Sequence, residues 1–537
     1  MRRSLKTTFA FAIAAAAILA TTSCAKEAPI DVMTFNEGVT AAEIIERIGN
    51  MGEATMENEA FIEEIFIDYT KLNDIEKAKV TNYEDLDDAR NAITKLYHTE
   101  EKDGPRIDRS KIQIGTYSFY NTSEERFQWL KEANIDFIIG APYNTDVLDL
   151  CLKYEVGAFL SYLPGWYGGD GSNAGGYVNS VPSGAFDSYA ANFVDHPAIW
   201  AVDVGDEPSA LDFPHYGVMI DEAKALFPNQ FVYLNIYPLY ADDVQEGAAN
   251  YTEYIKAYVK NINTDYISFD FYNIAEKDQT PNSTAHETGS DFFMLRHVEN
   301  LRIVSKTCKE KGIDMWTVIQ ANALSDTPLD YLTLEQIKAQ VYPCLAFGTQ
   351  AISWACWENG WYDFDTNMIS SAGVRTPSYY GVKEVNSYIK ALSPVYMRYE
   401  NTDTAFVGNI DAVRQRETMY GEDELNFIKT DGNVFEQDMF LDIKVACDNA
   451  VILAGSFVKR DGAGDAILFS NLTNFFGTDD LYKTDDFTST EISFKLKDTD
   501  RKVVIYYPET AYVMEPDENG VYSFSLENSD GAFITAE

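Results

Sequence analysis

Short apolar runs alternate with amphipathic stretches over the middle of the chain, from residue 111 to about residue 394. The apolar runs predict buried β-strands at residues 112–119, 137–141, 158–163, 199–204, 231–237, 266–272, 315–321 and 351–357. The stretches between them have the three- and four-residue spacing of amphipathic helices, at residues 123–133, 146–154, 186–193, 216–226, 251–261, 292–311, 334–347 and 379–392. Such an alternation of eight strands and eight helices predicts a (β/α)8 barrel.

A doubly wound open sheet is the alternative arrangement for alternating strands and helices. That fold places a glycine-rich phosphate-binding turn after an early strand. The first predicted strand contains Gly115-Thr116-Tyr117-Ser118 instead, which is not such a turn. The barrel is therefore the preferred prediction.

The segments on either side of the barrel have different patterns. Helical spacing recurs at residues 41–48, 58–72 and 86–97, which predicts a tether and a small helical module over residues 25–108. We expect this module to act as a spacer. Beyond residue 395 short alternating runs separated by Asp, Gly and Asn predict an antiparallel β-sandwich. Its predicted strands are residues 439–447, 450–458, 465–471, 490–496, 502–507 and 521–526, and the barrel is assigned to residues 109–394.

The first 24 residues have the features of a secretion signal. Arg2, Arg3 and Lys6 precede an apolar run that is too short to remain as a transmembrane helix. The run ends at Thr21-Thr22-Ser23-Cys24, which resembles a lipoprotein cleavage site and implies a lipid on Cys24. The family pattern prefers Leu at the position of Thr21, so ordinary signal-peptide cleavage is the alternative. The sequence thus predicts a secreted bacterial cell-surface lipoprotein.

The charge of the chain restricts its partners. Asp and Glu total 85 and Lys and Arg total 42, which gives a formal net charge of −43. Such a charge repels phosphate backbones and anionic lipid headgroups, so we expect no nucleic-acid binding and no membrane contact beyond the lipid anchor. Polyanionic substrates are disfavoured for the same reason, whereas neutral glycans remain compatible. The sequence leaves the oligomeric state open.

Carboxylates gather at the end of the fourth predicted strand. Asp203, Asp206 and Glu207 lie within five residues of one another, beside Gly205 and Pro208. In a (β/α)8 barrel the C-terminal ends of the strands carry the active site. Carboxylates so close raise one another's pKa, and a carboxylic acid that stays protonated near neutral pH can act as a general acid. A solvated acidic turn is the alternative interpretation.

The segment from His196 to Ala210, with Asp206-Glu207-Pro208 near its end, resembles the fourth-strand motif of barrel glycoside hydrolases of clan A. The resemblance extends over residues 111–537 and implies that Glu207 is the catalytic acid/base. It also implies that Asp206 contacts the sugar where the family has Asn. Residues 342–357 are similar to the seventh helix and eighth strand of these enzymes, which implies that Trp354 or Trp357 forms the floor of a sugar subsite.

The sequence departs from this family at the end of the seventh strand. The family nucleophile is a Glu, and Gln320 occupies the corresponding position here. An amide cannot form a glycosyl-enzyme ester, so the second carboxylate must be another residue. Asp270, at the sixth strand, and Glu358, after the eighth, are the candidates, and Glu358 is preferred. Their distance from the acid distinguishes retention, at about 5 Å, from inversion, at roughly 6.5–9.5 Å.

Other strand ends carry phenols and amides suited to sugar hydroxyl groups. The predicted substrate-binding residues are Tyr117, Asn235, Tyr237, Tyr272 and Gln320, and Tyr143, Asn144 and Asn322 lie at similar positions. Ordinary packing or helix capping is the alternative role for several of them. After the third strand, the glycine-rich loop 165–177 carries Trp166, which predicts a subsite wall or a lid. A plain surface loop is the alternative.

The sequence predicts no cofactor and no metal. Its histidines and cysteines lack metal-ligand spacing, and no serine-nucleophile motif occurs. We therefore expect a glycoside hydrolase that cleaves O-glycosidic bonds of neutral extracellular oligo- or polysaccharides. Two alternatives remain. A non-catalytic glycan-binding lipoprotein would explain Gln320, and a transporter's binding lipoprotein would have two lobes in place of eight strand–helix units.

Overall fold

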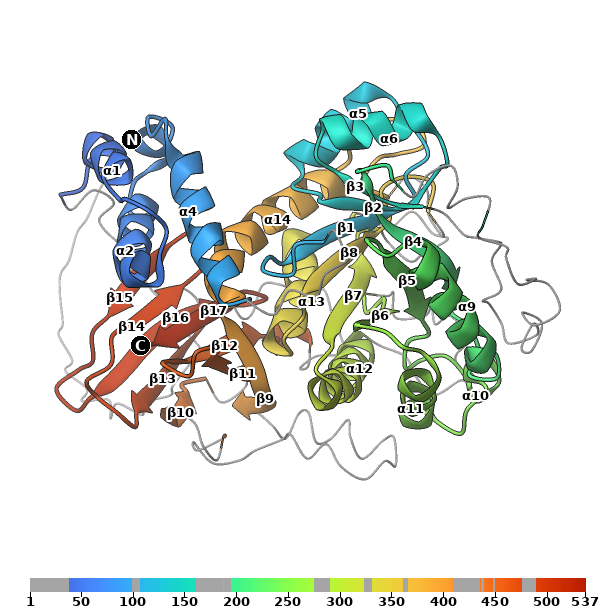
Figure 1. Cartoon of the computed structure of the whole chain (residues 1–537). Helices are drawn as coiled ribbons and strands as arrows, with labels where there is room; N and C mark the ends of the chain where they lie inside the picture. The colour runs from blue at the N-terminus through green and yellow to red at the C-terminus, as the bar shows by residue number, and fades with distance from the viewer. Residues whose placement is uncertain are drawn as a thin grey trace, which may run out of the picture.

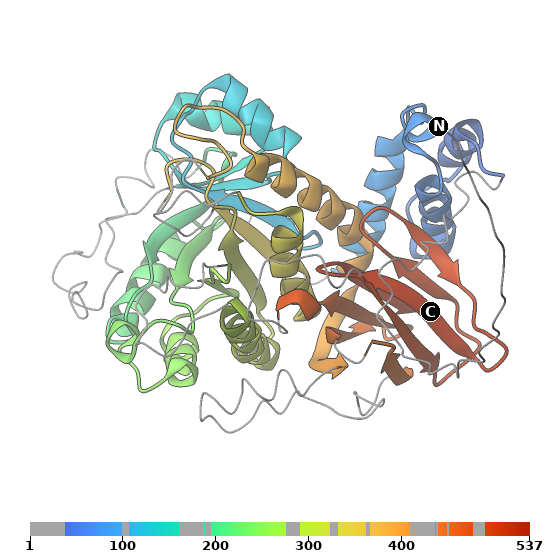
Figure 2. The same ribbon diagram turned by 180° about the vertical axis from the view of Figure 1, so that it is seen from behind.

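The computed structural model contains an N-terminal helical module, a barrel and two antiparallel sheets, in that order along the chain (Figure 1). Seen from behind, the helical module and the sheets lie on one side of the molecule and the barrel on the other (Figure 2). The structure describes residues 38–98, 107–160, 187, 195–274, 290–322, 331–360, 366–408, 435, 439–447, 450–475 and 489–537.

The N-terminal module consists of short helices with side-chain caps. A capping box begins α1 (Ala41–Gly49), in which the Thr40 hydroxyl accepts from the Glu43 N–H and the Glu43 carboxylate accepts from the Thr40 N–H. The other elements are η1 (Met56–Asn58), α2 (Glu59–Thr70), α3 (Asp74–Lys77) and α4 (Tyr83–Leu96). Helices α1, α2 and α4 confirm the three predicted helices to within three residues at each end.

The barrel consists of eight parallel strands that close on themselves, which confirms the predicted fold class. They are β1 (Gln113–Tyr117), β2 (Phe137–Ala141), β3 (Gly157–Leu160), β4 (Ile199–Asp206), β5 (Phe231–Ile236), β6 (Tyr266–Asp270), β7 (Asp314–Gln320) and β8 (Ala351–Ala355). Alternate side chains of each strand point inward, so Phe159, Phe231 and Trp316 fill the interior as one buried cluster. Each strand lies at a predicted position.

Helices cover the outside of the barrel. They are α5 (Glu124–Glu132), α6 (Thr145–Lys153), α9 (Phe213–Leu226), α10 (Asp243–Glu246), α11 (Tyr251–Asn261), α12 (Ser290–Lys311), α13 (Leu334–Ala346) and α14 (Pro377–Tyr396). Of the predicted helix at 186–193, all but one residue lies outside the described residues. The four-residue α10 was not predicted. Among the described helices, none has the length and apolar character needed to cross a membrane.

Two antiparallel sheets follow the barrel and confirm the predicted sandwich. One has the order β10-β13-β16 and the other the order β15-β14-β17-β12-β11-β9. The strands are β9 (Tyr399–Gly408), β10 (Phe440–Val445), β11 (Val451–Lys459), β12 (Asp465–Asn471), β13 (Ser489–Leu496), β14 (Val503–Tyr506), β15 (Ala511–Met514), β16 (Val521–Glu527) and β17 (Gly531–Ala536), with η2 (Thr473–Phe475) after β12. Buried side chains of both sheets, such as Phe494 and Phe469, form one core.

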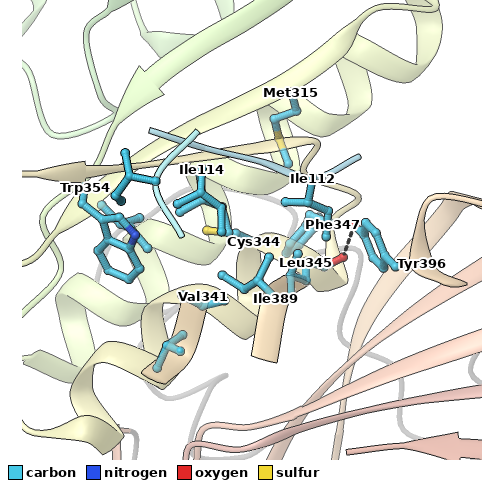
Figure 3. Close-up of a cluster of buried hydrophobic side chains, with 14 of the residues drawn as sticks. Ile112, Ile114, Met315, Val341, Cys344, Leu345, Phe347, Trp354, Ile389 and Tyr396 are labelled. Carbon is cyan, nitrogen blue, oxygen red and sulfur yellow. Dashed lines mark hydrogen bonds between the residues drawn. The ribbon is translucent and has the colours of Figure 1, made fainter. Parts of the chain in front are cut away.

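The barrel packs on the six-stranded sheet through α13 and α14. Val341, Leu345 and Ile389 belong to the buried cluster between these parts (Figure 3). At the end of α14 the Tyr396 hydroxyl donates to the Leu345 carbonyl over 2.8 Å, and its ring packs edge-on against Phe533 of β17 at 5.7 Å. Burial of these apolar side chains is the main contribution to the stability of the interface between the barrel and the six-stranded sheet.

The N-terminal module shares its core with the rest of the chain. Ile44, Ile62 and Ile93 belong to the same buried apolar cluster as the outer layer of the barrel. At the end of α2, the Thr70 hydroxyl donates to the Ala511 carbonyl of β15 at 3.1 Å and accepts from the Ala511 N–H at 3.0 Å. The module therefore packs against β15, the edge strand of the six-stranded sheet, in addition to any role as a spacer.

Candidate active site

Three carboxylates meet at the C-terminal edge of the barrel. Asp206 ends β4, Glu207 follows it, and Asp270 ends β6. Asn235, near the end of the intervening strand β5, connects two of them, because its Nδ2 donates to Asp206 Oδ1 at 3.2 Å and to Asp270 Oδ1 at 2.8 Å. The structure thus brings together four of the predicted site residues, at the edge where barrel enzymes carry their chemistry.

The backbone holds Glu207 in an unusual conformation. Its φ is +47°, in the left-handed region that disfavours residues with a side chain by roughly 1–2 kcal/mol. The Glu207 N–H donates to the Asn235 carbonyl at 3.0 Å, and the carbonyl of the next residue, Pro208, accepts from the Tyr254 hydroxyl at 2.7 Å. These bonds compensate the strained turn and fix the point from which the Glu207 side chain starts. Strain of this kind concentrates at functional sites.

Burial and like charges raise the pKa of all three carboxyl groups. Burial raises the pKa of Asp206 to about 6, although the hydrogen bond from Asn235 opposes the shift. Burial and the charge of Asp206 raise the pKa of Asp270 to about 7. Burial, followed by the charges of Asp270 and Asp206, raises the pKa of Glu207 well above its usual value. No Lys or Arg in the described part of the chain is among the main causes of these shifts.

Unequal pKa values suit acid–base chemistry. Near neutral pH, Asp206 is mainly ionised, whereas Glu207 keeps its proton and can donate it to a leaving group. A neutral acid beside an ionised carboxylate is the arrangement that general acid catalysis requires. Among the described residues, no group of three or more His, Cys, Asp and Glu side chains could hold a metal ion.

A line of hydroxyl groups runs below the carboxylates, inside the barrel. Tyr117 and Tyr233 share a hydrogen bond of 2.7 Å, Tyr233 and Ser268 share one of 2.9 Å, and Ser268 donates to Asn235 Oδ1 at 3.0 Å. Of these residues, Tyr233 and Ser268 were not among the predicted site residues. Period-two alternation could have found them, because Tyr233 precedes Asn235 by two positions and Ser268 precedes Asp270 by two.

Buried Asp203 also belongs to this interior layer and was not singled out for a role of its own. Its side chain is 2% exposed, and its Oδ1 accepts from the Gly205 N–H at 3.3 Å. Burial and the charge of Asp206 raise the pKa of Asp203 well above its usual value. Asp203 therefore loses its proton less readily than an ordinary aspartate.

Glu358, the preferred second carboxylate from the sequence, is an anchor for a loop. Its Oε1 accepts from the backbone N–H groups of Tyr120 and Asn121, and its Oε2 lies 4.0 Å from Arg126. Glu358 is 5% exposed, and its side chain holds the segment after β1 against the segment after β8. These bonds use the carboxylate, and its charge does not act on Glu207. The structure therefore favours Asp270 over Glu358 as the partner of Glu207.

The predicted aromatic floor does not fit the structure. Trp354 and Trp357 have no exposed area, so neither can present a ring face to a sugar. Trp354 points out of the barrel toward α14, where its Nε1 donates to Asn386 Oδ1 at 2.9 Å (Figure 3). Trp357 packs against Phe119 and Tyr379. Both belong to the outer apolar core, as does Tyr237, which is 2% exposed.

The remaining predicted residues have mixed placements. Tyr272 lies beside Asp270, and a hydrogen bond between them opposes the rise of the Asp270 pKa. Asn144 caps α6, since its Oδ1 accepts from the Asp146 N–H at 2.9 Å. Asn322 is fully buried, whereas Tyr143 is partly exposed. Trp166 and Cys24 lie outside the described residues, and their predicted roles stay predictions.

The side chain of Gln320, at the position of the family nucleophile, is bonded to backbone groups of the protein. Its Oε1 accepts from the Ile274 N–H at 2.8 Å, and its Nε2 donates to the carbonyls of Ile274 at 2.9 Å and Asn322 at 3.0 Å. Both amide hydrogens are used and the side chain is fully buried. The amide therefore ties the segment after β6 to the end of β7 and leaves no group for a ligand.

We expect Gln320→Glu to destabilise the protein without raising any hydrolytic activity. A carboxylate cannot donate to two carbonyl groups, and leaving buried polar groups without partners costs about 1–3 kcal/mol. Urea unfolding and hydrolysis assays would measure both effects. Gln336→Glu is the matched control, because the partly exposed Gln336 side chain uses only its Oε1 to cap α13. A variant at position 320 that gains activity would contradict the structural role of Gln320.

No protein-family model and no curated protein matches the chain. Several solved structures of glycoside hydrolases are similar to it. The endo-beta-1,4-mannanase from Thermotoga petrophila has 9% identity and a TM-score of 0.37, over 81% of this chain and 96% of that one. A GH42 beta-galactosidase from G. stearothermophilus has 10% identity and a TM-score of 0.42, over 79% and 98%. The beta-galactosidase from Marinomonas ef1 has 9% identity and a TM-score of 0.39, over 53% and 61%. Similarity at this level assigns no activity to this chain.

Proposed function

We propose that the protein is a glycoside hydrolase that cleaves O-glycosidic bonds in neutral oligo- or polysaccharides, with Glu207 as the general acid. One observation carries the proposal. Glu207, Asp206 and Asp270 converge at the C-terminal edge of a (β/α)8 barrel, and their environments separate their pKa values. Hydrolysis of a glycosidic bond needs one protonated and one ionised carboxyl group on either side of the bond.

Asp270 is the proposed second carboxylate. It shares Asn235 with Asp206 and acts directly on the pKa of Glu207. In the proposed mechanism Glu207 protonates the departing oxygen, and Asp270 either attacks the anomeric carbon or activates a water molecule. Asp206, Tyr117 and Tyr272 are the proposed contacts to sugar hydroxyl groups. The net charge of −43 supports an uncharged glycan over a polyanionic one.

An extracellular location and a lipid on Cys24 belong to the same proposal and rest on the sequence signal. A non-catalytic glycan-binding protein is the second candidate, and Gln320 is the observation in its favour. The two are separated by assaying the wild-type protein against neutral glycans and aryl glycosides for both binding and cleavage. Binding without cleavage of any member of the panel would favour the second candidate.

We expect kcat/KM for hydrolysis to have a bell-shaped pH dependence with its optimum near or above neutrality. Asp270, with a pKa raised to about 7, must lose its proton to act, so activity falls as pH decreases through that value, by about tenfold per unit. Glu207 must keep its proton, so activity falls again as pH rises above its raised pKa. Initial rates across the pH range would check this profile. Glu358→Gln is the comparison, because its acidic limb should coincide with that of the wild type.

A further inference from the structure

The hydroxyl groups inside the barrel form one continuous path to the carboxylates. It starts at Tyr117 on β1, crosses to Tyr233 on β5 and Ser268 on β6, and returns to Asn235 on β5. Three strands thus contribute to a single line of side chains. Ser268 and Asn235 are 1% and 3% exposed, and Tyr233 is 1% exposed, so bulk water does not compete for these bonds.

The orientation of the Asn235 amide sets the order of protons along the path. Asn235 Oδ1 carries no hydrogen, so the Ser268 hydroxyl must donate to it. Ser268 has then used its only hydrogen and must accept from Tyr233. Tyr233 has in turn used its hydrogen and must accept from Tyr117. Each member therefore fixes the direction of the next one.

The two carboxylates and the hydroxyl path together fix the orientation of the Asn235 amide. The two hydrogens of Nδ2 point toward Asp206 Oδ1 at 3.2 Å and Asp270 Oδ1 at 2.8 Å, and Ser268 donates to Oδ1 at 3.0 Å. The reverse orientation would direct the amide oxygen at two carboxylates and would remove the hydrogen bond that Ser268 donates to that oxygen. Asn235 therefore places one N–H on each carboxylate, and the Ser268 hydroxyl stabilises this orientation.

We propose that Asn235 is the positioning residue for the Asp206–Asp270 pair and that Tyr117, Tyr233 and Ser268 act through it by fixing its amide. The catalytic meaning of this inference rests on the proposed function. The bridge that Asn235 forms between Asp206 and Asp270 can be tested through the titration of these two carboxyl groups, without a measurement of activity. Asn235 touches the two carboxylates, whereas Ser268 and Tyr233 influence them only through the orientation of that amide.

The two N–H groups of Asn235 stabilise the ionised forms of Asp206 and Asp270 among other acidic and neutral groups. The titratable groups that interact with the pair come from several neighbouring elements. They are Asp203 and Glu207 from β4 and its turn, Tyr117 from β1, Tyr233 from β5, Tyr251 from α11 and Tyr272 after β6. All of these are carboxylic acids or neutral phenols. The hydrogen bonds from Asn235 lower the pKa of both Asp206 and Asp270 against this background.

The test compares Ser268→Ala, Tyr233→Phe and Asn235→Leu with the wild-type protein. Infrared titration of protein labelled with ¹³C at the aspartate carboxyl groups reports ionisation directly, whether or not a substrate is cleaved. We expect the titration of the Asp206–Asp270 pair to move upward by about one pH unit in Ser268→Ala and by more in Asn235→Leu. The acidic limb of kcat/KM should move by the same amount.

Tyr396→Phe is the matched control for the loss of a buried hydroxyl. Tyr396 is 2% exposed and donates to the Leu345 carbonyl at 2.8 Å, in the interface between the barrel and the six-stranded sheet (Figure 3). This variant should lose stability as Tyr233→Phe does, but its aspartate titration should match that of the wild type. A shift of the aspartate titration in Tyr396→Phe as large as that in Tyr233→Phe would overturn the positioning role, because a general loss of stability would then explain both shifts.

The outcomes separate this inference from the proposed function. An unchanged aspartate titration in folded Ser268→Ala and Asn235→Leu would overturn the bridge. If Asn235→Leu does not fold, Ser268→Ala decides the question, since it removes only one hydroxyl group. A shifted titration in a protein that cleaves no glycan would support the bridge and refute the hydrolase.

Discussion

Replacing Glu207 by glutamine is expected to reduce kcat/KM for glycan hydrolysis by about 10²–10⁴-fold, the usual contribution of a general acid. Glutamine has the size of glutamic acid and is uncharged, and the wild-type Glu207 is itself protonated near neutral pH because burial and the charges of Asp270 and Asp206 raise its pKa. The substitution therefore removes the proton that is transferred and leaves the charge of the folded site unchanged.

The leaving group distinguishes loss of the acid from loss of the site. Aryl glycosides with good leaving groups need little protonation, so we expect their hydrolysis by Glu207→Gln to be affected much less than that of glycans. The basic limb of the pH profile should disappear. Circular dichroism and thermal unfolding would show that the variant is folded.

Glu246→Gln is the control for this experiment. Glu246, in α10, is 2% exposed, and burial together with the charge of Asp243 raises its pKa to about 8. Glu246 is thus another glutamic acid whose pKa is raised by burial, but it lies outside the carboxylate cluster, so its replacement should leave hydrolysis unchanged. If Glu207→Gln cleaves glycans as well as the wild type does, another group supplies the proton.

The barrel could be predicted because hydrophobic periodicity is a local property. Strands β2 and β12 have the bounds that the sequence predicted, since each is bordered by polar or turn-forming residues. Strand β17 was missed because it lies between β14 and β12 and is buried throughout, so its sequence has no alternation. Strand β9 was missed because its first half is mostly exposed and polar, and only its second half is apolar.

The candidate site could be predicted only where position along the strand decides it. Asp206, Asn235 and Asp270 lie at strand ends and point inward, so topology alone brings them together. Successive side chains of a strand point alternately into and out of the barrel, and this alternation determines that Trp354 points outward. Ala351 belongs to the interior cluster, whereas Ile352 and Trp354 belong to the outer core. Applying this alternation to β8 would have placed Trp354 outside.

Glu358 and Gln320 could not be placed from the sequence, because their partners are backbone groups of distant segments. Glu358 accepts from residues that follow β1, and β1 adjoins β8 only because the barrel closes. Gln320 is bonded to Ile274, which follows the neighbouring strand β6. Both side chains replace missing backbone pairing at the top of the barrel, a role that residue type alone does not indicate.

A buried group of charges connects the three parts of the chain. Arg398, between α14 and β9, is paired with Glu59 at 2.9 Å and with Glu63 at 2.7 Å, both on α2. Arg90 of α4 also pairs with Glu63 at 3.1 Å, and Lys459 of β11 pairs with Glu59 at 3.1 Å. The Arg398 and Arg90 side chains are 1% and 0% exposed. The N-terminal module is therefore held by ion pairs that water does not screen.

We expect Arg398→Met to lower the free energy of unfolding by about 3–5 kcal/mol, because removing one partner of a buried ion pair leaves the other charge uncompensated. The melting temperature should fall by roughly 3–4 °C, because the entropy of unfolding of a chain of 537 residues is large. Differential scanning calorimetry and urea unfolding would measure the change. Methionine is close to arginine in length and is apolar, so the loss of packing is small.

Arg47→Met is the matched control, and pH provides a second one. Arg47 is 26% exposed and pairs with Glu64 at 3.0 Å and with Asp68 at 2.5 Å, so water screens these pairs and the loss of Arg47 should cost less, about 1 kcal/mol. Burial would raise the pKa of Glu63, but Arg90 and Arg398 outweigh burial and lower that pKa from its usual 4.5. The stabilisation from Glu63 is thus present above pH 4.5 and is lost as pH falls through the lowered folded-state pKa. The difference between Arg398→Met and wild type should shrink over that range, and a difference that does not depend on pH would show that lost packing, not lost charge pairing, destabilises the variant.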